Sequence, residues 1–368
     1  MKHQDLEANK QSMEKAIVSL FSGCGGLDLG FCKAGFNIVW ANEYDRDIWK
    51  TYETNHLETF LDKRDIRQVP SEEIPDCIGI IGGPPCQSWS EAGTQRGIDD
   101  DRGKLFLEYV RILKDKQPRF FLAENVSGML HKKHNLARQN IITAFEEAGY
   151  VISFKLLNAM HYNVPQERKR FIFVGYHVDV NKRFDFDSLV ATSPIPTLQD
   201  AIGDLRESAI PAWENNKTQG EACSVPNHEY MVGGFSSIYM SRNRVRSWNE
   251  PSFTIQAGGR HAPIHPQANK MIHVGKDEWI FDPNSPKRYQ RLSVRECARI
   301  QTFPDEFIFQ YERLAAAYKM IGNAVPVNLS YALAQAIYED LFEHNQGVNK
   351  NNKSNKSILS TQLILACS

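Results

Sequence analysis

The stretch Gly79-Ile80-Ile81-Gly82-Gly83-Pro84-Pro85-Cys86-Gln87-Ser88 joins an apolar run to a cysteine on a proline-framed loop. An apolar run bounded by glycines is typical of a short buried strand in a parallel sheet. Cys86 then follows the carboxyl end of that strand, the edge at which open α/β sheets bind ligands. A free cysteine is more often a small buried apolar residue. Because polar residues follow Cys86 at once, the pattern favours a nucleophile.

A glycine-rich turn follows the first apolar run of the chain. Residues 16–21 predict a strand, Ser22-Gly23-Cys24-Gly25-Gly26 a turn, and residues 27–34 a helix. Glycines at such a turn let the backbone approach a ligand closely. Glu43, about 20 residues after Gly23, is placed to bind ribose hydroxyls in a Rossmann-type fold. Asp28 stands where the dinucleotide fingerprint has its third glycine, so we expect a nucleoside cofactor other than NAD.

A third apolar run, residues 120–126, predicts a strand that carries Glu124 to the same edge of the sheet. A carboxyl group that leaves an apolar strand is suited to donating or sharing a proton. The alternative is a helix N-cap or a solvated strand end.

Six blocks of the sequence together resemble the ordered signature motifs of the cytosine-5 DNA methyltransferases of bacterial restriction-modification type. They are Phe21 to Gly26, Pro84-Pro85-Cys86-Gln87, Glu124-Asn125-Val126, Gln166-Glu167-Arg168-Lys169-Arg170, residues 291–304, and Gly322-Asn323-Ala324-Val325-Pro326. The resemblance spans residues 16–343. Trp89 and Cys24 depart from the family pattern, but both roughly keep the size and apolar character of the usual residue.

The resemblance implies an α/β fold, a Rossmann-like S-adenosylmethionine-dependent methyltransferase sheet with a second, smaller and irregular target-recognition domain. The alternation of strands and helices over residues 16–176 also predicts a mostly parallel sheet with helices on both faces. We expect a charged lead over 1–15, a discontinuous catalytic domain over 16–180 and 310–343, and the recognition domain over 181–309. Residues 344–368 form a low-complexity tail, which we expect to be disordered.

The resemblance also implies a covalent mechanism on a cytosine that is flipped out of the DNA helix. Cys86 would add to C6 of the base, and Glu124 would act at N3. Arg168 would lie near the flipped base and the thiolate. These three residues are the expected catalytic set.

S-adenosyl-L-methionine is the cofactor that the resemblance implies. The expected cofactor-binding residues are Phe21, Ser22, Gly23, Cys24, Gly25, Gly26, Glu43, Asp65, Pro85 and Asn323. Asp65 would contact the adenine amino group, and Asn323 would help to close the pocket.

Duplex DNA is the expected partner, and arginines dominate one segment of the predicted recognition domain. Arg242, Arg244 and Arg246 alternate, so they would share one face if that segment is extended. Arginine pairs bidentately with guanine, although a solvated charged face is the alternative. The expected DNA-binding residues are Gln87, Ser88, Arg170, Arg242, Arg244, Arg246, Thr254 and Arg260. Residues 226–230 and 239–246 resemble the recognition domain of methyltransferases that modify the inner cytosine of GGCC.

Composition excludes several other classes of protein. The chain has 368 residues, more than one hydrophobic core usually holds, and a formal net charge of −1. Seven cysteines without a C-x-x-C pair argue against a disulfide framework and a zinc site. No apolar run approaches ~18 residues, and the first 15 residues lack an apolar core, so we expect no membrane span, no signal peptide and a cytoplasmic location.

Two other functions stay open at the level of the sequence. An RNA cytosine-5 methyltransferase of the tRNA-modifying type would share the catalytic blocks. A DNA-binding regulator without activity would share the arginine cluster, although Cys86, Glu124 and Arg168 are all intact. A cognate restriction endonuclease that acts on the same site, without a stable complex, is a further expected partner.

Overall fold

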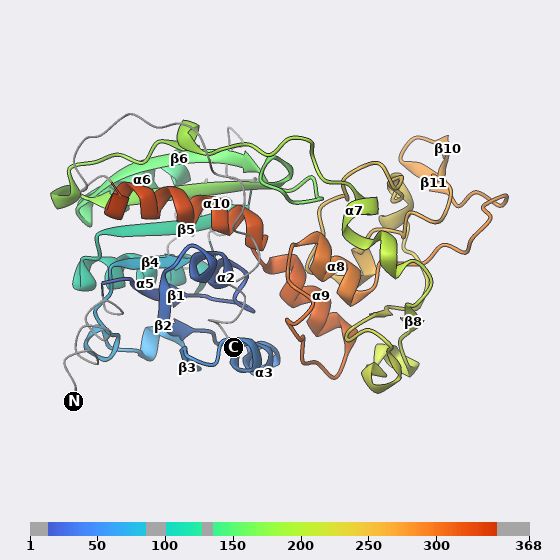
Figure 1. The fold of residues 1–368 in the computed structure, drawn as a ribbon, viewed down its shortest axis with the longest axis horizontal. Helices are drawn as coiled ribbons and strands as arrows, with labels where there is room; N and C mark the ends of the chain where they lie inside the picture. Colours follow the sequence, from blue (N-terminus) through green and yellow to red (C-terminus); the bar gives the residue numbers. More distant parts are fainter. Residues whose placement is uncertain (1–13, 86–100, 127–134, 344–368) are drawn as a thin grey trace, which may run out of the picture.

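A seven-stranded sheet organises the larger part of the molecule (Figure 1). The computed structural model describes residues 14–85, 101–126 and 135–343. The strand order is β3-β2-β1-β4-β5-β7-β6. The strands are β1 (Ala16–Leu20), β2 (Asn37–Asn42), β3 (Phe60–Asp62), β4 (Gly79–Gly82), β5 (Phe120–Val126), β6 (Tyr150–Asn158) and β7 (Lys169–His177). The first five in this order pair in parallel, as predicted, whereas β7 is antiparallel to both β5 and β6.

Helices cover both faces of this sheet, because its central strands are apolar on both sides. On one face, Val18, Ile80 and Phe121 pack against α5 (Asp101–Lys116) and α6 (Asn135–Glu147). On the other face, the alternate residues Ile17 and Ile81 pack against α2 (Gly26–Lys33) and α10 (Val327–Tyr338). The expectation of helices on both faces is confirmed.

The end of the segment 310–343, which we expected to belong to the catalytic domain, returns to the sheet as α10. Ser330 Oγ donates a hydrogen bond of 2.5 Å to the carbonyl of Leu27 in α2. The two helices lie so close that a Cβ on Gly30 would lie 2.3 Å from Ser330 Cβ. Residues that are about 300 positions apart therefore build one layer against the sheet.

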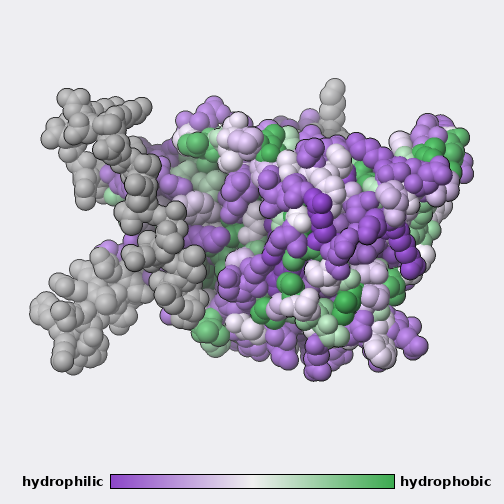
Figure 2. Space-filling view, turned by 45° about the vertical axis from the view of Figure 1, so that its right-hand side comes forward, coloured by the Kyte–Doolittle hydropathy of each residue, from purple (hydrophilic) through white to green (hydrophobic). Residues whose placement is uncertain are grey.

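A second, more irregular part lies beside the carboxyl ends of the strands (Figure 1). Its elements are α7 (Leu198–Ile202), α8 (Val294–Ile300), α9 (Leu314–Asn323) and the short strands β8 (Ile210–Pro211), β9 (Glu229–Tyr230), β10 (Ile272–Gly275) and β11 (Glu278–Ile280). Helices α7, α8 and α9 share one apolar core, and a smaller core forms around Tyr239, Val245 and Ile264. On the face in Figure 2, hydrophilic side chains predominate.

The position of α9 differs from that of α10, although both belong to the predicted catalytic segment 310–343. Leu314, Tyr318 and Ile321 of α9 pack in the same core as Val294 and Cys297 of α8. Only the residues after Asn323 return to the sheet. The C-terminal end of α9 thus lies between the two parts of the molecule.

A buried polar cluster supports the strand-to-helix turn after β1. His56, at the end of α3 (Arg46–Asn55), stacks on Tyr52 with ring centroids 4.2 Å apart. Its Nε2 donates to the carbonyl of Cys24 at 3.3 Å. Burial lowers the pKa of His56 from 6.5 to about 4, whereas burial raises the pKa of Asp28, which accepts from Tyr52, to about 6.

His56 should make the fold sensitive to acid. Between pH 6.5 and 4 the unfolded chain protonates this ring and the folded chain does not, so stability is lost as the pH falls through that window. His56→Gln keeps an N–H donor without a titrating group. From pH 7.5 to 5, the wild type should lose about 2 kcal/mol more unfolding free energy than the variant, as measured by urea unfolding.

Asp28 titrates in the same range with the opposite sign, because its raised pKa favours the folded state at low pH. Comparing the two proteins cancels this contribution. Equal losses in both would contradict a neutral, buried His56.

Candidate active site

A cavity of about 680 Å³ opens at the carboxyl ends of the parallel strands. Four segments of the sheet contribute to it, and the end of α9 closes one side. Its lining residues include Ser19, Phe21, Ser22, Gly23, Gly26, Leu27, Glu43, Asp45, Ile48, Gly82, Gly83, Pro84, Pro85, Leu105, Glu124, Asn125, Arg170, Lys319, Met320, Gly322 and Asn323. The expectation that this edge carries the site agrees with the position of the cavity.

The glycine turn and Glu43 form one end of the cavity. The amide of Gly23 donates to Glu43 Oε2 at 2.9 Å, and the amide of Asp45 donates to Oε1 at 2.7 Å. Burial raises the pKa of Glu43. Two main-chain donors thus fix the carboxylate at the wall, and each of its oxygens keeps a lone pair for a hydroxyl group.

The loop after β4 and the end of β5 form the other end of the cavity. Asn125 Nδ2 donates to the carbonyl of Pro84 at 3.0 Å. A Cβ on Gly83 would lie 3.4 Å from Glu124 Oε2, so the carboxylate adjoins the loop that leads to Cys86. Cys86, Gln87 and Ser88 lie outside the described residues.

Glu124 is paired with an arginine, which is Arg170 rather than Arg168. Arg170 Nε lies 2.7 Å from Glu124 Oε1, and both side chains are nearly buried, at 12% and 11% exposed. Burial lowers the pKa of Arg170, and the charge of Glu124 opposes that shift. The pair places a fixed cation and a carboxylate at the wall of the cavity.

Arg168, which we expected near the reacting base, does not line the cavity. It is fully buried and donates to the carbonyls of Ile255, Gly322 and Ala324 at 2.9, 2.8 and 2.9 Å. Burial lowers its pKa. Its guanidinium therefore connects main-chain segments, and Arg170 is the arginine of this motif that lines the cavity.

The expected cofactor residues divide into two groups. Those that line the cavity are Phe21, Ser22, Gly23, Gly26, Glu43, Pro85 and Asn323. Cys24, Gly25 and Asp65 do not. The thiol of Cys24 points into the core and donates to the carbonyl of Met320 at 3.6 Å, while Asp65 accepts from Arg67 Nε at 2.9 Å and caps a short turn.

Some residues of the cavity were not expected from the sequence. Lys319 of α9 forms an ion pair with Asp45 across the cavity wall. The sequence held a signal for Lys319, because it precedes Asn323 by four residues and so shares its face of a helix. Asp45 follows Glu43 by two residues, but nothing in the local pattern distinguished it.

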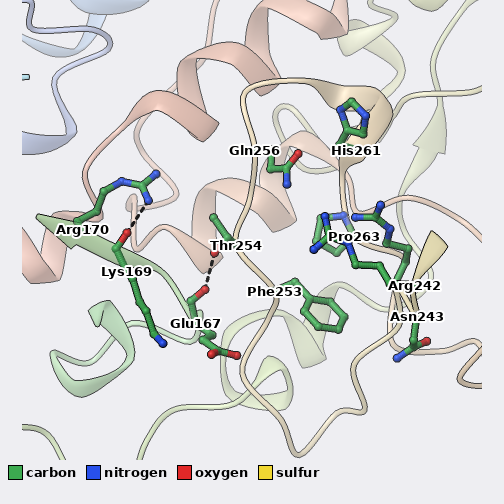
Figure 3. A pocket seen from close by; sticks show the side chains of 11 residues that line it. Glu167, Lys169, Arg170, Arg242, Asn243, Phe253, Thr254, Gln256, His261 and Pro263 are labelled. Carbon is green, nitrogen blue, oxygen red and sulfur yellow. Dashed lines mark hydrogen bonds between the residues drawn. The ribbon is translucent and has the colours of Figure 1, made fainter. Parts of the chain in front are cut away.

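A groove of about 400 Å³ runs between β7 and the irregular part (Figure 3). Arg170 and Lys169 lie on one side of it, and Arg242 and His261 on the other. Arg170 lines both this groove and the cavity at the strand ends. The groove thus adjoins the site at Glu124 through Arg170.

The arginines of residues 242–246 do not share one free face, because this segment is irregular rather than an extended strand. Arg242 is exposed. Arg244 is buried and donates to the carbonyls of Tyr239 and Ile238 at 2.7 and 3.0 Å. Arg246 forms ion pairs with two carboxylates.

Two further expected DNA contacts, Thr254 and Arg260, line hollows of the irregular part. Thr254 lines the groove and donates through Oγ1 to the carbonyl of Glu167 at 2.6 Å. Arg260 is exposed and lines a neighbouring hollow of about 340 Å³. Among the described residues, no cluster of His, Cys, Asp and Glu could hold a metal ion, and no helix is long and apolar enough to cross a membrane.

Comparison with known proteins points to one family. The model of the C-5 cytosine-specific DNA methylases matches residues 15–339. The type II methyltransferase M.MthTI of Methanothermobacter thermautotrophicus is 58% identical over 329 residues, which cover 89% of this chain and 98% of the relative. M.NgoPII of Neisseria gonorrhoeae, another type II methyltransferase, is 54% identical, with 88% of this chain and 96% of the relative covered.

Solved structures share the fold at lower identity. The Entamoeba histolytica methyltransferase EhMeth aligns with a TM-score of 0.65 at 18% identity, covering 89% of this chain and 99% of its own. The Dnmt2 methyltransferase of S. pombe aligns with a TM-score of 0.60 at 17% identity, with the same coverage.

Two glycines of the turn allow a matched test of its packing. Both have positive φ, +57° at Gly23 and +86° at Gly25. A Cβ on Gly23 meets no described atom within 4 Å, whereas one on Gly25 would lie 2.0 Å from His56 Nε2. Gly23→Ala should cost about 1 kcal/mol of unfolding free energy from backbone strain alone. Gly25→Ala should cost at least about 3 kcal/mol, because the buried ring must also move.

Chemical unfolding of the protein without ligand measures both variants. Equal losses in the two would show that His56 does not support the turn.

Proposed function

The chain belongs to the C-5 cytosine-specific DNA methylase family, and we propose that it methylates the inner cytosine of GGCC in duplex DNA through a covalent adduct with Cys86. It is a type II DNA (cytosine-5) methyltransferase that uses S-adenosyl-L-methionine. The single observation that carries the proposal is the Arg170–Glu124 pair, in which Glu124 lines the cavity and Arg170 lines both the cavity and the groove.

The cavity at the strand ends suits S-adenosylmethionine. Its volume of about 680 Å³ lies in the range of small-molecule sites. We assign the methionine end to the turn Phe21 to Gly26, the ribose hydroxyls to Glu43, and the closing of the pocket to Asn323. The bound cofactor supplies an electrophilic methyl group. Asp65 receives no role, because Arg67 holds its carboxylate away from the cavity.

Cys86 makes the cytosine reactive. C5 of an aromatic cytosine is too weak a nucleophile to take a methyl group. Addition of the Cys86 thiolate to C6 breaks the aromaticity and makes C5 enamine-like. C5 then bonds to the methyl group while the S–CH3 bond of the sulfonium breaks and leaves a neutral thioether. A base removes the C5 proton, the C6–S bond breaks, and the thiolate and the aromatic ring are restored.

Glu124 and Arg170 support the addition of the thiolate. Negative charge develops on the ring at N3 as the sulfur adds, and Glu124 donates a proton or a hydrogen bond there. Arg170 fixes the orientation of that carboxylate at 2.7 Å. A cation at this place also lowers the pKa of a neighbouring thiol, which is the effect first expected of Arg168.

Target recognition falls to the irregular part, about residues 181–309, which faces the groove. Arg242 and Arg260 are the exposed arginines among the four candidates, and each can pair with the O6 and N7 of a guanine. GGCC offers four guanines per duplex. The resemblance of residues 226–230 and 239–246 to GGCC-specific enzymes supports this target, as does the arginine-rich groove.

The proposal predicts which DNA the enzyme protects. Plasmid DNA from cells that make the protein should resist an endonuclease that cuts GGCC, because the inner cytosine of each strand carries a methyl group. Bisulfite sequencing should place 5-methylcytosine in GG-methylC-C. A purified duplex in which GGCC is replaced by GCGC, of the same composition, should accept no methyl groups, and neither should tRNA.

Complete cutting of the plasmid, with methylcytosine mapped elsewhere, would overturn the target. Methyl transfer to tRNA in place of DNA would favour the RNA enzyme. A host that carries such a methylase would also tolerate a cognate endonuclease for GGCC, the partner that the proposal implies.

A further inference from the structure

Arg246 uses both of its terminal nitrogens within the protein, unlike the exposed Arg242 four residues before it. Its Nη2 lies 2.9 Å from Glu167 Oε2, and its Nη1 lies 3.1 Å from Glu250 Oε1. The guanidinium also stacks on Phe253, 4.1 Å from the ring centroid. To read a base, it would have to break two ion pairs and leave this ring.

Glu250, one of its two partners, is itself held in place. It accepts from the amide and the hydroxyl of Ser247 at 2.9 and 2.5 Å, and it pairs with Lys270 at 3.0 Å. These hydrogen bonds and the ion pairs lower its pKa to about 2. The carboxylate is therefore ionised at neutral pH and offers Arg246 a fixed anchor in the irregular part.

Glu167, the other partner, belongs to the segment that leads into β7. Its amide donates to the carbonyl of Ser252 at 2.8 Å, and its own carbonyl accepts from Thr254 Oγ1 at 2.6 Å. Three residues later the same segment presents Arg170 to Glu124. Arg246 thus connects the arginine-rich segment of the groove to the strand that carries the catalytic pair.

We propose that Arg246 is a positioning residue, which fixes the register between the recognition segment and the strand that bears Arg170. It is not a reader of guanine. This inference rests on the proposed role of the groove in binding the target DNA. Through Glu167, Arg246 sets how a bound target site is placed relative to Glu124 and Cys86.

The exposure of these groups indicates where the effect should appear. Glu167 is 45% exposed and Arg246 23%, and ion pairs of this kind contribute little to stability. A small misplacement of the reacting groups, in contrast, can reduce a catalytic rate about 100-fold. Loss of Arg246 should therefore lower turnover more than stability or DNA affinity.

The test compares Arg246→Met, Arg246→Lys, Glu167→Gln and the double variant Arg246→Met/Glu167→Gln in the full chain. The substrate is a duplex with the site that bisulfite sequencing maps for the wild type. Lys287→Met is the control, because it removes an exposed ion pair with Glu207 in the same part of the molecule. Steady-state kinetics give kcat and KM for DNA, and a titration gives the affinity for S-adenosylmethionine.

Arg246→Met should lower kcat roughly 10- to 100-fold, with KM for DNA within about threefold of the wild type. Glu167→Gln should act in the same direction, and the double variant should be no slower than the slower single variant, since one interaction is lost. Arg246→Lys should recover part of the rate, because an ammonium group can keep one of the two pairs. Lys287→Met should match the wild type.

Three results would overturn the proposal. An unchanged kcat with relaxed preference at one base pair would make Arg246 a reader. A raised KM on all sequences with unchanged kcat would make it a phosphate contact. Loss of affinity for S-adenosylmethionine would show that Arg246 supports the structure of the enzyme as a whole rather than the placement of the DNA. A mapped site other than GGCC would refute that target and leave this test intact, because the substrate follows the mapped site.

Discussion

The carboxyl ends of β4 and β5 lie side by side because the two strands pair in parallel, with Gly82 opposite Ala123. This pairing brings the loop towards Cys86 and the carboxylate of Glu124 to one edge. The antiparallel β7 then adds Arg170. In the pairing of β5 with β7, Glu124 lies opposite Ile172. Arg170 is therefore the diagonal neighbour of Glu124 on the same face of the sheet. Three strands thus assemble the end of the cavity that we propose to be catalytic, and the glycine turn after β1 forms the end proposed for the cofactor.

The connection between the two parts of the molecule is buried and polar. Arg168 donates to three main-chain carbonyls, and Gln166 donates to Gln301, whose amide in turn donates to Ile321 and Ala324. Burying a guanidinium is costly unless its donors are satisfied, so this junction tolerates little displacement. The segment 166–170 therefore connects the two parts through Arg168 and contributes Arg170 to the wall of the cavity.

Much of this architecture could be predicted from the sequence, because apolar runs bounded by glycine define buried strands and the family motifs follow in order. The resemblance also assigned residues 310–343 to the catalytic domain, and α10 within this segment packs on the sheet. The roles of Arg168 and Arg170 could not be separated from the sequence, because both arginines belong to one motif and only their tertiary contacts differ. The ion pair between Arg246 and Glu167 joins residues that are 79 positions apart. A local sequence pattern cannot predict a contact over such a separation. Cys24 and Asp65 were assigned by their place in a motif, but their side chains point away from the cavity.

The proposed covalent step through Cys86 is tested most directly by trapping the adduct. A duplex with 5-fluorocytosine at the target cannot lose the group at C5, so the adduct should persist. The wild type should form a stable protein–DNA complex only with S-adenosylmethionine present, and mass spectrometry should place the bond on Cys86. Cys86→Ser should form none, and Glu124→Gln should form it ~10²-fold more slowly. An equal yield of adduct from Cys86→Ser, or a bond mapped to another residue, would contradict the mechanism.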